Sequence, residues 1–209
     1  MTPAAATLSN PAAAGVKFLR RNCKTLPPPG VKFSNFSAGD VLLMQNETNM
    51  VAEAIDRAYA KGMKVAFNAS PIQTAIRDYP LQKVRWLFIN EIEGEALSGE
   101  SDPQKMLCSL RKKYPTTEVI LTLGEKGSIW GGENGTVSCK ALQVQALDTT
   151  GAGDTFTGFF LRGVLDPVQG VFPLTLAGTA SAIAVTRAGA AKSIPDIEEV
   201  KDWLKRSSV

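Results

Sequence analysis

Short apolar runs alternate with stretches of helical periodicity from Asp40 to the C-terminus. The apolar runs predict strands at 41–45, 64–68, 84–89, 119–123, 128–130 and 136–139. Apolar residues at helical spacing predict helices at 48–61, 91–97, 103–114, 155–163, 174–186 and 197–205. Because the strands are apolar enough to be buried on both faces, this alternation predicts an α/β fold, with a mainly parallel sheet sandwiched by helices.

Several residues mark where these elements begin or end. Gly62 is placed to stop the helix at 48–61. Asp196 and Glu199 have the spacing of a capping box at the start of the last helix. The glycine-rich stretch 131–135 predicts a hairpin turn between two strands.

The first 39 residues have a different composition from the rest of the chain. They are rich in alanine and proline, contain Pro27, Pro28 and Pro29 in a row, and carry no acidic residue before Asp40. Basic residues without acids are typical of targeting segments, but the prolines break any long amphipathic helix. We therefore predict that residues 1–39 are disordered or atypical and that residues 40–209 form the folded domain.

Composition and charge narrow the classes of function. The chain has 209 residues, of which 44% are hydrophobic and 21% charged, as in ordinary globular proteins. A net charge of +3 without a dense basic stripe argues against a nucleic-acid partner, and the lack of a continuous apolar span argues against a membrane one. Cys23, Cys108 and Cys139 are scattered and histidine is absent, which argues against zinc, disulfides and an imidazole-based triad. These features predict a reducing compartment, the cytoplasm, with access to the nucleus left open.

The run Asp148-Thr149-Thr150-Gly151-Ala152-Gly153-Asp154-Thr155-Phe156 carries the most chemical information. Small residues precede Asp154 where a helix should begin, and the first N–H groups of a helix can hold an anion. An acid beside such an anion hole repels phosphate, but it makes sense as the base that takes a proton from an attacking hydroxyl. The alternative is a glycine-rich turn with Asp154 as a helix cap.

This run resembles the signature of the ribokinase-like sugar kinases, also called PfkB carbohydrate kinases. Further segments resemble the family in the same order, and they are 42–47, 68–71, 90–93, 122–127, 184–190 and 193–195. The resemblance begins at about Asp40, and nothing before it is similar to the family's Gly-Gly sugar motif or lid strands. It therefore implies the C-terminal part of such a kinase, without the N-terminal sugar-binding and lid region.

The resemblance also implies roles for individual residues. Asp154 would be the base and a sugar contact, Glu47 a second sugar contact, and Gly151, Ala152 and Gly153 the anion hole. Asn90 and Glu93 would position Mg²⁺ through water, although the same pair could be an ordinary helix N-cap. The residues that would contact the nucleotide are Thr122, Gly124, Glu125 and Gly127, although Gly-x-x-Gly could be only a turn.

A monovalent-cation site for K⁺ is also implied by the resemblance. Its ligands would be the side chains of Asp148 and Ser193 and the backbone carbonyls of Thr150, Arg187 and Gly189. The alternative is that Asp148 is only an acidic residue of a turn and that Ser193 only caps a helix. Oxygen-only ligation suits such an ion.

The function implied is transfer of the ATP γ-phosphoryl group to the 5-hydroxyl of ribose, with Mg²⁺ and K⁺ as cofactors. Ribose and ATP would be the small-molecule partners, and a homodimer is left open. The alternative is a non-catalytic nucleotide-binding isoform or interaction protein derived from a sugar kinase. Turnover by this chain is left open, because the matching region lacks the front part of the family.

Overall fold

The computed structural model describes residues 16–18, 33, 36–47, 50–133 and 135–207. The chain divides into two compact units. The first unit takes the residues up to Leu121 together with Gly131–Gly135. The second takes Thr122–Trp130 together with Thr136–Val209.

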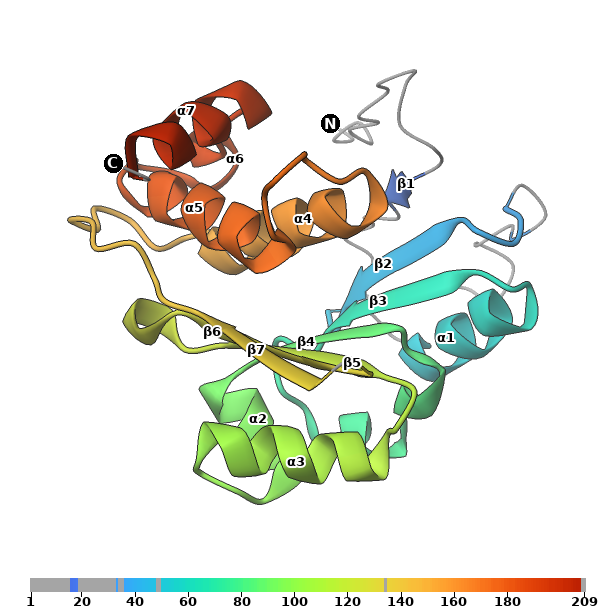
Figure 1. The fold of residues 1–209 in the computed structure, drawn as a ribbon. Coiled ribbons are helices and arrows are strands. Elements are labelled where there is room, and N and C mark those ends of the chain that lie inside the picture. Colours follow the sequence, from blue (N-terminus) through green and yellow to red (C-terminus); the bar gives the residue numbers. More distant parts are fainter. Residues whose placement is uncertain (1–15, 19–32, 34–35, 48–49, 134, 208–209) are drawn as a thin grey trace. The chain divides into compact units, whose positions relative to one another are not determined.

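Seven strands of the described chain form a sheet in which neighbours follow the order of the sequence (Figure 1). They are β1 (Val16–Phe18), β2 (Val41–Gln45), β3 (Lys64–Asn68), β4 (Trp86–Asn90), β5 (Glu118–Thr122), β6 (Ser128–Gly132) and β7 (Gly135–Cys139). The pairs β1–β2, β2–β3 and β3–β4 are parallel. Only two residues join β6 to β7, too few for a parallel crossover, so these strands run antiparallel and the sheet is mixed.

Helices and single 3₁₀ turns connect the strands. The helices of the described chain are α1 (Val51–Ala60), α2 (Glu91–Ser98), α3 (Pro103–Lys113), α4 (Ala152–Leu165), α5 (Pro173–Val185), α6 (Ala190–Ser193) and α7 (Ile197–Ser207). The 3₁₀ turns are Thr74–Asp78, Leu81–Lys83 and Gly124–Lys126. The predicted α/β class, a sheet flanked by helices, is confirmed.

In the first unit, α1, α2 and α3 lie along one face of the strands (Figure 1). Helix α1 buries Val51, Ile55 and Ala58, the positions that its helical spacing places on one face. Strand β3 is buried on both faces, and Val65 and Phe67 have no exposed surface. Burial on both faces is what the continuous apolar run predicts.

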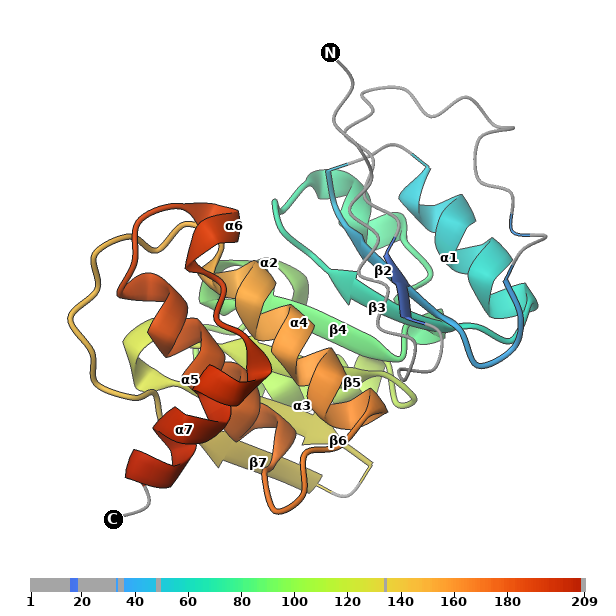
Figure 2. The same ribbon diagram turned by 90° about the horizontal axis from the view of Figure 1, so that it is seen from above.

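In the second unit, α4 and α5 lie side by side in both views of the ribbon (Figures 1 and 2). Leu176, Ala180 and Ile183 of α5 form a fully buried cluster with Val200 of α7. The three α5 residues have the helical spacing from which a helix at 174–186 was predicted. Trp130 of β6 packs edge-on against Phe160 of α4, with ring centroids 5.0 Å apart.

Some boundaries differ from those predicted. Strand β4 begins at Trp86 and not at residue 84, because Val84 closes the preceding 3₁₀ turn by donating its N–H to the carbonyl of Leu81. Helix α4 begins at Ala152, three residues before the predicted start. The predicted start of α1, at residues 48 and 49, lies outside the described residues.

Besides the 3₁₀ turns, one helix and one strand of the described chain were not predicted. The helix α6 is a single turn, too short to show a hydrophobic period. Strand β1 lies within the segment 1–39 and pairs with β2, with Val16 opposite Val41. Most of the remainder of that segment lies outside the described residues, so its predicted disorder stays a prediction.

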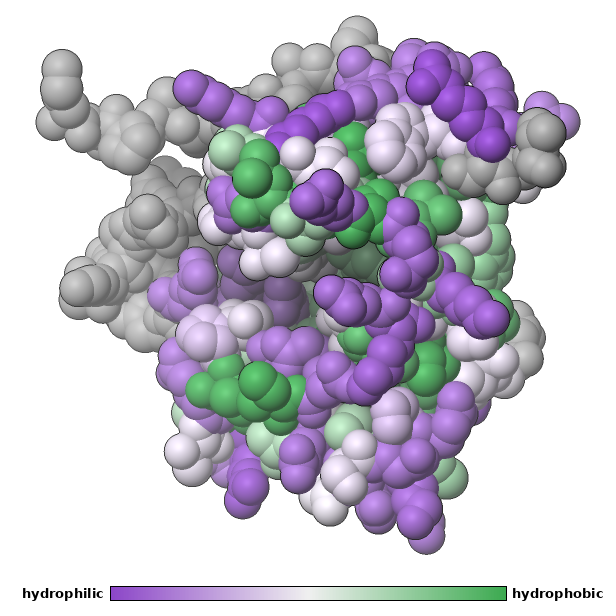
Figure 3. All heavy atoms as spheres, turned by 90° about the vertical axis from the view of Figure 1, so that its left-hand side faces the viewer, coloured by the Kyte–Doolittle hydropathy of each residue, from purple (hydrophilic) through white to green (hydrophobic). Residues whose placement is uncertain are grey.

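The surface mixes hydrophilic and hydrophobic residues. On the face drawn in Figure 3, the hydrophobic residues form separate patches among hydrophilic ones. The large exposed hydrophobic side chains of the described chain are Tyr59, Ile92, Val137, Leu147, Phe172 and Ile194. None of the helices that the structure describes combines the length and the apolarity needed to cross a bilayer.

Candidate functional site

The predicted anion hole forms the first turn of α4. Gly151 is the N-cap, with a left-handed φ of 79°, and its carbonyl accepts from the N–H of Thr155 at 2.9 Å. Because glycine has no side chain, this helix start has no side-chain cap. A Cβ placed on Gly153 would have no atom within 4 Å, so open space adjoins this backbone.

The acid predicted as the base is exposed beside that open space. Asp154 occupies the third position of α4. The N–H of Ala152 donates to the carbonyl of Thr149 at 3.2 Å, so the turn itself engages this amide. On α5, the hydroxyl of Ser181 donates to the carbonyl of Ala152 at 3.1 Å and holds the turn in place. Nothing in the sequence marked Ser181, because one hydroxyl in an apolar helix carries no positional signal.

Asp148 joins the anion-hole turn to the segment after α5. Its Oδ1 accepts from the N–H of Thr150 at 2.9 Å, and its Oδ2 accepts from the N–H of Gly189 at 2.8 Å. The backbone N–H of Gly189, followed by hydrogen bonds from Thr150, lowers the pKa of Asp148 to about 2. Three of the predicted K⁺ ligands are therefore brought together by one carboxylate.

The other two predicted K⁺ ligands lie at the two ends of the same segment. Arg187 forms an ion pair with Glu199 of α7. The hydroxyl of Ser193 is buried and donates to the carbonyl of Ala190 at 2.8 Å. The ion pair and the Asp148 carboxylate together fix the backbone that precedes α6.

The predicted nucleotide turn follows β5. Thr122 ends the strand, and the 3₁₀ turn Gly124–Lys126 carries the exposed Glu125. Gly127 has a φ of 103°, and a Cβ there would stand 2.0 Å from the carbonyl oxygen of Cys139, so no other residue fits. Gly124 has a φ of 54° but open space around it.

Asn90 and Glu93 form the reciprocal helix cap that was the alternative reading of their spacing. The side-chain oxygen of Asn90 accepts from the N–H of Glu93 at 2.9 Å. Oε2 of Glu93 accepts from the N–H of Asn90 at 2.8 Å. Glu93 is only 4% exposed, and this cap occupies one of its two carboxylate oxygens.

Glu47 is exposed in the turn after β2, and its neighbour Asn46 anchors that turn. The amide of Asn46 donates to the carbonyl of Pro71 at 2.8 Å, and its Oδ1 accepts from the hydroxyl of Tyr79 at 3.0 Å. Burial raises the pKa of Tyr79. No sequence pattern indicated the contact between Asn46 and Tyr79, since they lie 33 residues apart.

The predicted site residues are divided between the two units. Glu47, Asn90 and Glu93 belong to the first unit, and all the others belong to the second. Within each unit the structure joins a predicted pair or set by hydrogen bonds: Asn90 with Glu93, and Asp148 with Thr150 and Gly189.

Comparison with known proteins identifies relatives of this chain. The model of the pfkB family of carbohydrate kinases matches residues 30–197. Ribokinase of Haemophilus influenzae is 33% identical over 181 residues, which are 83% of this chain and 58% of that protein. The chain thus spans little more than half the length of this relative.

Solved ribokinase structures have the same fold. The structure of ribokinase from Thermotoga maritima matches with a TM-score of 0.70 and 33% identity, covering 84% of this chain and 60% of that one. The structure of Arabidopsis thaliana ribokinase complexed with ribose and ATP matches with a TM-score of 0.71 and 26% identity, covering 79% and 55%. Since the family model extends over most of the chain and ribokinases share both its sequence and its fold, the chain belongs to the pfkB family of carbohydrate kinases.

Proposed function

We propose that this chain acts in the transfer of the γ-phosphoryl group of ATP to the 5-hydroxyl of ribose. The observation that carries the proposal is the exposed carboxylate of Asp154 in the first turn of α4, beside the open backbone of Gly153. The choice of ribose and ATP is supported by the ribokinase relatives, one of which was solved with both.

Asp154 has the chemistry and the place of a general base. It accepts the proton that the sugar hydroxyl loses as that hydroxyl attacks phosphorus. The positive end of the α4 dipole and the amides around Gly153 stabilise negative charge at the same turn. Glu47, exposed after β2, contacts the sugar in this proposal.

The nucleotide is held by the turn after β5 in this proposal. Thr122, Gly124, Glu125 and Gly127 lie on or next to that turn, and the open space at Gly124 leaves room for a ligand against its backbone. ATP, when bound, supplies the phosphoryl group that is transferred. The chain's own contribution is to position that group and to shield its charge.

Mg²⁺ and K⁺ fit the residues that the family resemblance names. The described residues contain no group of three or more His, Cys, Asp or Glu side chains that could hold a metal directly. Mg²⁺ bound through water needs fewer ligands, and Oε1 of Glu93 takes no part in the Asn90 cap. K⁺ is favoured by the Asp148 carboxylate, which brings the backbones of Thr150 and Gly189 close to each other, with Arg187 and Ser193 on the same segment.

Calorimetric titration of the chain with a non-hydrolysable ATP analogue and Mg²⁺ tests the nucleotide half of the proposal. We expect saturable binding, and a folded sample that shows no saturable heat contradicts it. A coupled ADP-release assay with ribose, fructose or adenosine tests the sugar half. Faster turnover of fructose or adenosine than of ribose would contradict the choice of ribose.

A further inference from the structure

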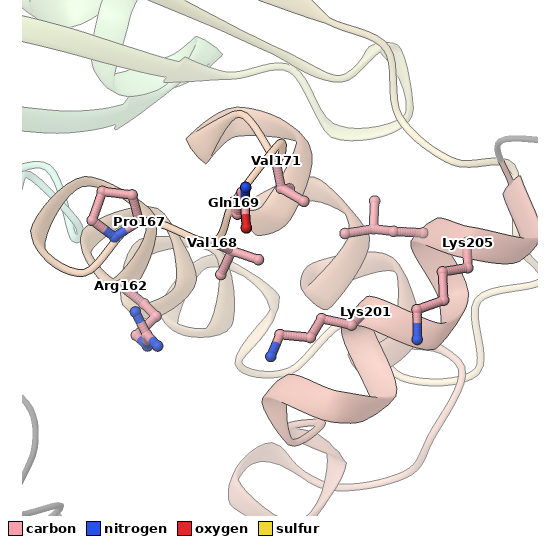
Figure 4. Close-up of a pocket in the computed structure, with 8 residues that line it drawn as sticks. Arg162, Pro167, Val168, Gln169, Val171, Lys201 and Lys205 are labelled. Carbon is pink, nitrogen blue, oxygen red and sulfur yellow. The ribbon is translucent and has the colours of Figure 1, made fainter.

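A groove in the second unit is separate from every residue assigned a role above. It lies between the C-terminal half of α4, the loop from α4 to α5, and α7, and its volume is about 650 Å³ (Figure 4). Arg162, which lines it, follows Asp154 by eight residues on α4. At 1.5 Å per residue this places the groove ~12 Å along the helix from the proposed base. We call it the α7 groove.

The floor of the α7 groove is apolar and firmly packed. Val168 and Val171 from the loop and Leu204 from α7 line it. All three pack on the fully buried cluster of Leu176, Ala180, Ile183 and Val200. This floor is therefore continuous with the core of the unit, and an apolar group lying on it would be removed from water.

Three cations also line the groove. Lys201 and Lys205 are four residues apart on α7, on the same helix face as Leu204, and Arg162 comes from α4 (Figure 4). The lining contains no carboxylate, and Gln169 adds a neutral amide. The charged side chains that line the groove are therefore all cationic.

Each cation already pairs with a carboxylate about one turn away. For the two lysines this carboxylate lies on α7, and for Arg162 it belongs to the C-cap of α4. The pairs are Arg162–Asp166 at 2.8 Å, Lys201–Glu198 at 2.7 Å and Lys205–Asp202 at 3.1 Å. These carboxylates are exposed and lie outside the groove lining. Exposed pairs of this kind contribute little, so the two lysines can turn to an anion in the groove at small loss. Arg162 also donates to the backbone carbonyl of Asp166, so it would turn at a larger loss.

We propose that the α7 groove binds a small organic anion, an apolar body bearing a carboxylate or sulfonate. The apolar body lies on Val168, Val171 and Leu204, and the anionic group is held by Lys201, Lys205 and Arg162. The volume falls within the range of about 300–1,000 Å³ found for small-molecule sites. Inorganic phosphate would leave the floor uncovered, and a neutral apolar compound would leave the cations unused.

Titration calorimetry of the 209-residue chain with three probes tests this assignment. The probes are naphthalene-2-carboxylate, the neutral naphthalene-2-methanol with the same ring body, and inorganic phosphate. We expect one saturable site for the carboxylate and at least tenfold weaker binding of the other two. Absence of saturable binding, or equal binding of all three probes, overturns the proposal.

Matched variants locate the site. The double variant Lys201→Gln/Lys205→Gln should weaken binding of naphthalene-2-carboxylate at least tenfold. Lys105→Gln/Lys112→Gln, which removes the same charge from exposed positions on α3, should leave the affinity unchanged. If both double variants weaken binding equally, the probe is attracted by the overall charge and not by the groove. If an ATP analogue displaces the probe, the probe binds in the nucleotide site. Either result overturns the proposal.

Discussion

The single residue that bears most on the proposed chemistry is Asp154. In a form of the protein that turns over ribose, Asp154→Asn should lower kcat by ~10²–10⁴, the usual contribution of a general base. Affinity for the ATP analogue should persist, because removing a negative charge beside phosphates cannot weaken their binding electrostatically. The coupled ADP-release assay and calorimetry measure the two effects.

The control for that experiment is Asp202→Asn, which removes an exposed carboxylate of α7 and should leave kcat unchanged. An Asp154→Asn protein that keeps more than a tenth of the wild-type kcat contradicts the base role.

Asp148 predicts a pH dependence of stability. Its pKa in the folded protein is about 2, below the ordinary value of 3.8, so its stabilising effect is complete above that ordinary value and is lost as the pH falls toward 2. Asp148→Asn, which offers one acceptor to two N–H groups, should therefore be less stable than wild type at pH 7. The difference should shrink as the pH falls from about 4 to about 2.

Urea unfolding at a series of pH values measures this difference for Asp148→Asn. The same series on Asp202→Asn, at an exposed position, provides the baseline. If the difference in unfolding free energy between wild type and Asp148→Asn stays constant down to pH 2, the ionised Asp148 carboxylate does not stabilise the protein by joining Thr150 to Gly189.

The two glycines of the nucleotide turn differ in surroundings and should differ in tolerance. Gly124→Ala places a Cβ in open space and should cost roughly 1–2 kcal/mol for its left-handed φ alone. Gly127→Ala adds a clash with the Cys139 carbonyl and should cost distinctly more. Thermal or urea unfolding of the two variants makes the comparison, and equal losses would show that the close approach to Cys139 is not a constraint.

Among the elements, the turn after β2 depends on a buried amide. Asn46 is 1% exposed and connects this turn to the segment after β3 through Pro71 and Tyr79. Asn46→Ala leaves its hydrogen-bond partners unsatisfied and should destabilise the chain by about 1–3 kcal/mol.

Tyr79→Phe, which removes a single bond of the same network, should cost less, about 0.5–1.5 kcal/mol. Urea unfolding compares the two variants. If Tyr79→Phe costs as much as Asn46→Ala, the Tyr79 hydroxyl and not the Asn46 amide is the main anchor.

Sequence patterns predicted those elements whose buried residues form an apolar run or a helical period within one segment. Strands β2 and β3 were predicted to the residue, because a short apolar run buried on both faces has sharp ends. The start of β4 was placed two residues early because a 3₁₀ turn also buries apolar residues, Leu81 and Val84. Single-turn elements such as α6 have too few residues for any period.

In the candidate site, too, the residues that are adjacent in sequence were predicted, whereas the contacts between distant residues were not. The glycines and Asp154 of the α4 start are consecutive in sequence, so the motif revealed them. The hydrogen bond from Gly189 to Asp148 spans 41 residues, and that from Ser181 to Ala152 spans 29. Such contacts depend on how α5 packs on α4, which no local pattern encodes.

For the whole molecule, the predicted sugar contacts are sparse. Glu47 and Asp154 are the two sugar contacts predicted in this chain. Holding an acceptor in line with the γ-phosphate can provide roughly 7–11 kcal/mol of barrier reduction, and two carboxylates cannot orient a small hydrated sugar. We therefore expect the 209-residue chain to bind the ATP analogue but to phosphorylate ribose poorly.

The coupled assay with Mg²⁺, K⁺ and excess ribose measures this turnover. A rate approaching the typical enzyme median of ~10 s⁻¹ would show that these two contacts suffice. Titration of the same sample with the ATP analogue is the control, since it separates lost catalysis from lost nucleotide binding.

The N-cap of α4 is Gly151, whereas the N-caps of α2 and α3 are Asn90 and Asp102, whose side chains accept N–H groups of their first turns. The start of α4 has no such acceptor from its own N-cap, so a bound anion would complete it. A ligand bound there would therefore stabilise the first turn of α4. Hydrogen exchange at its amides would slow when the ligand is present, and the ligand would raise the unfolding temperature of the unit that contains α4.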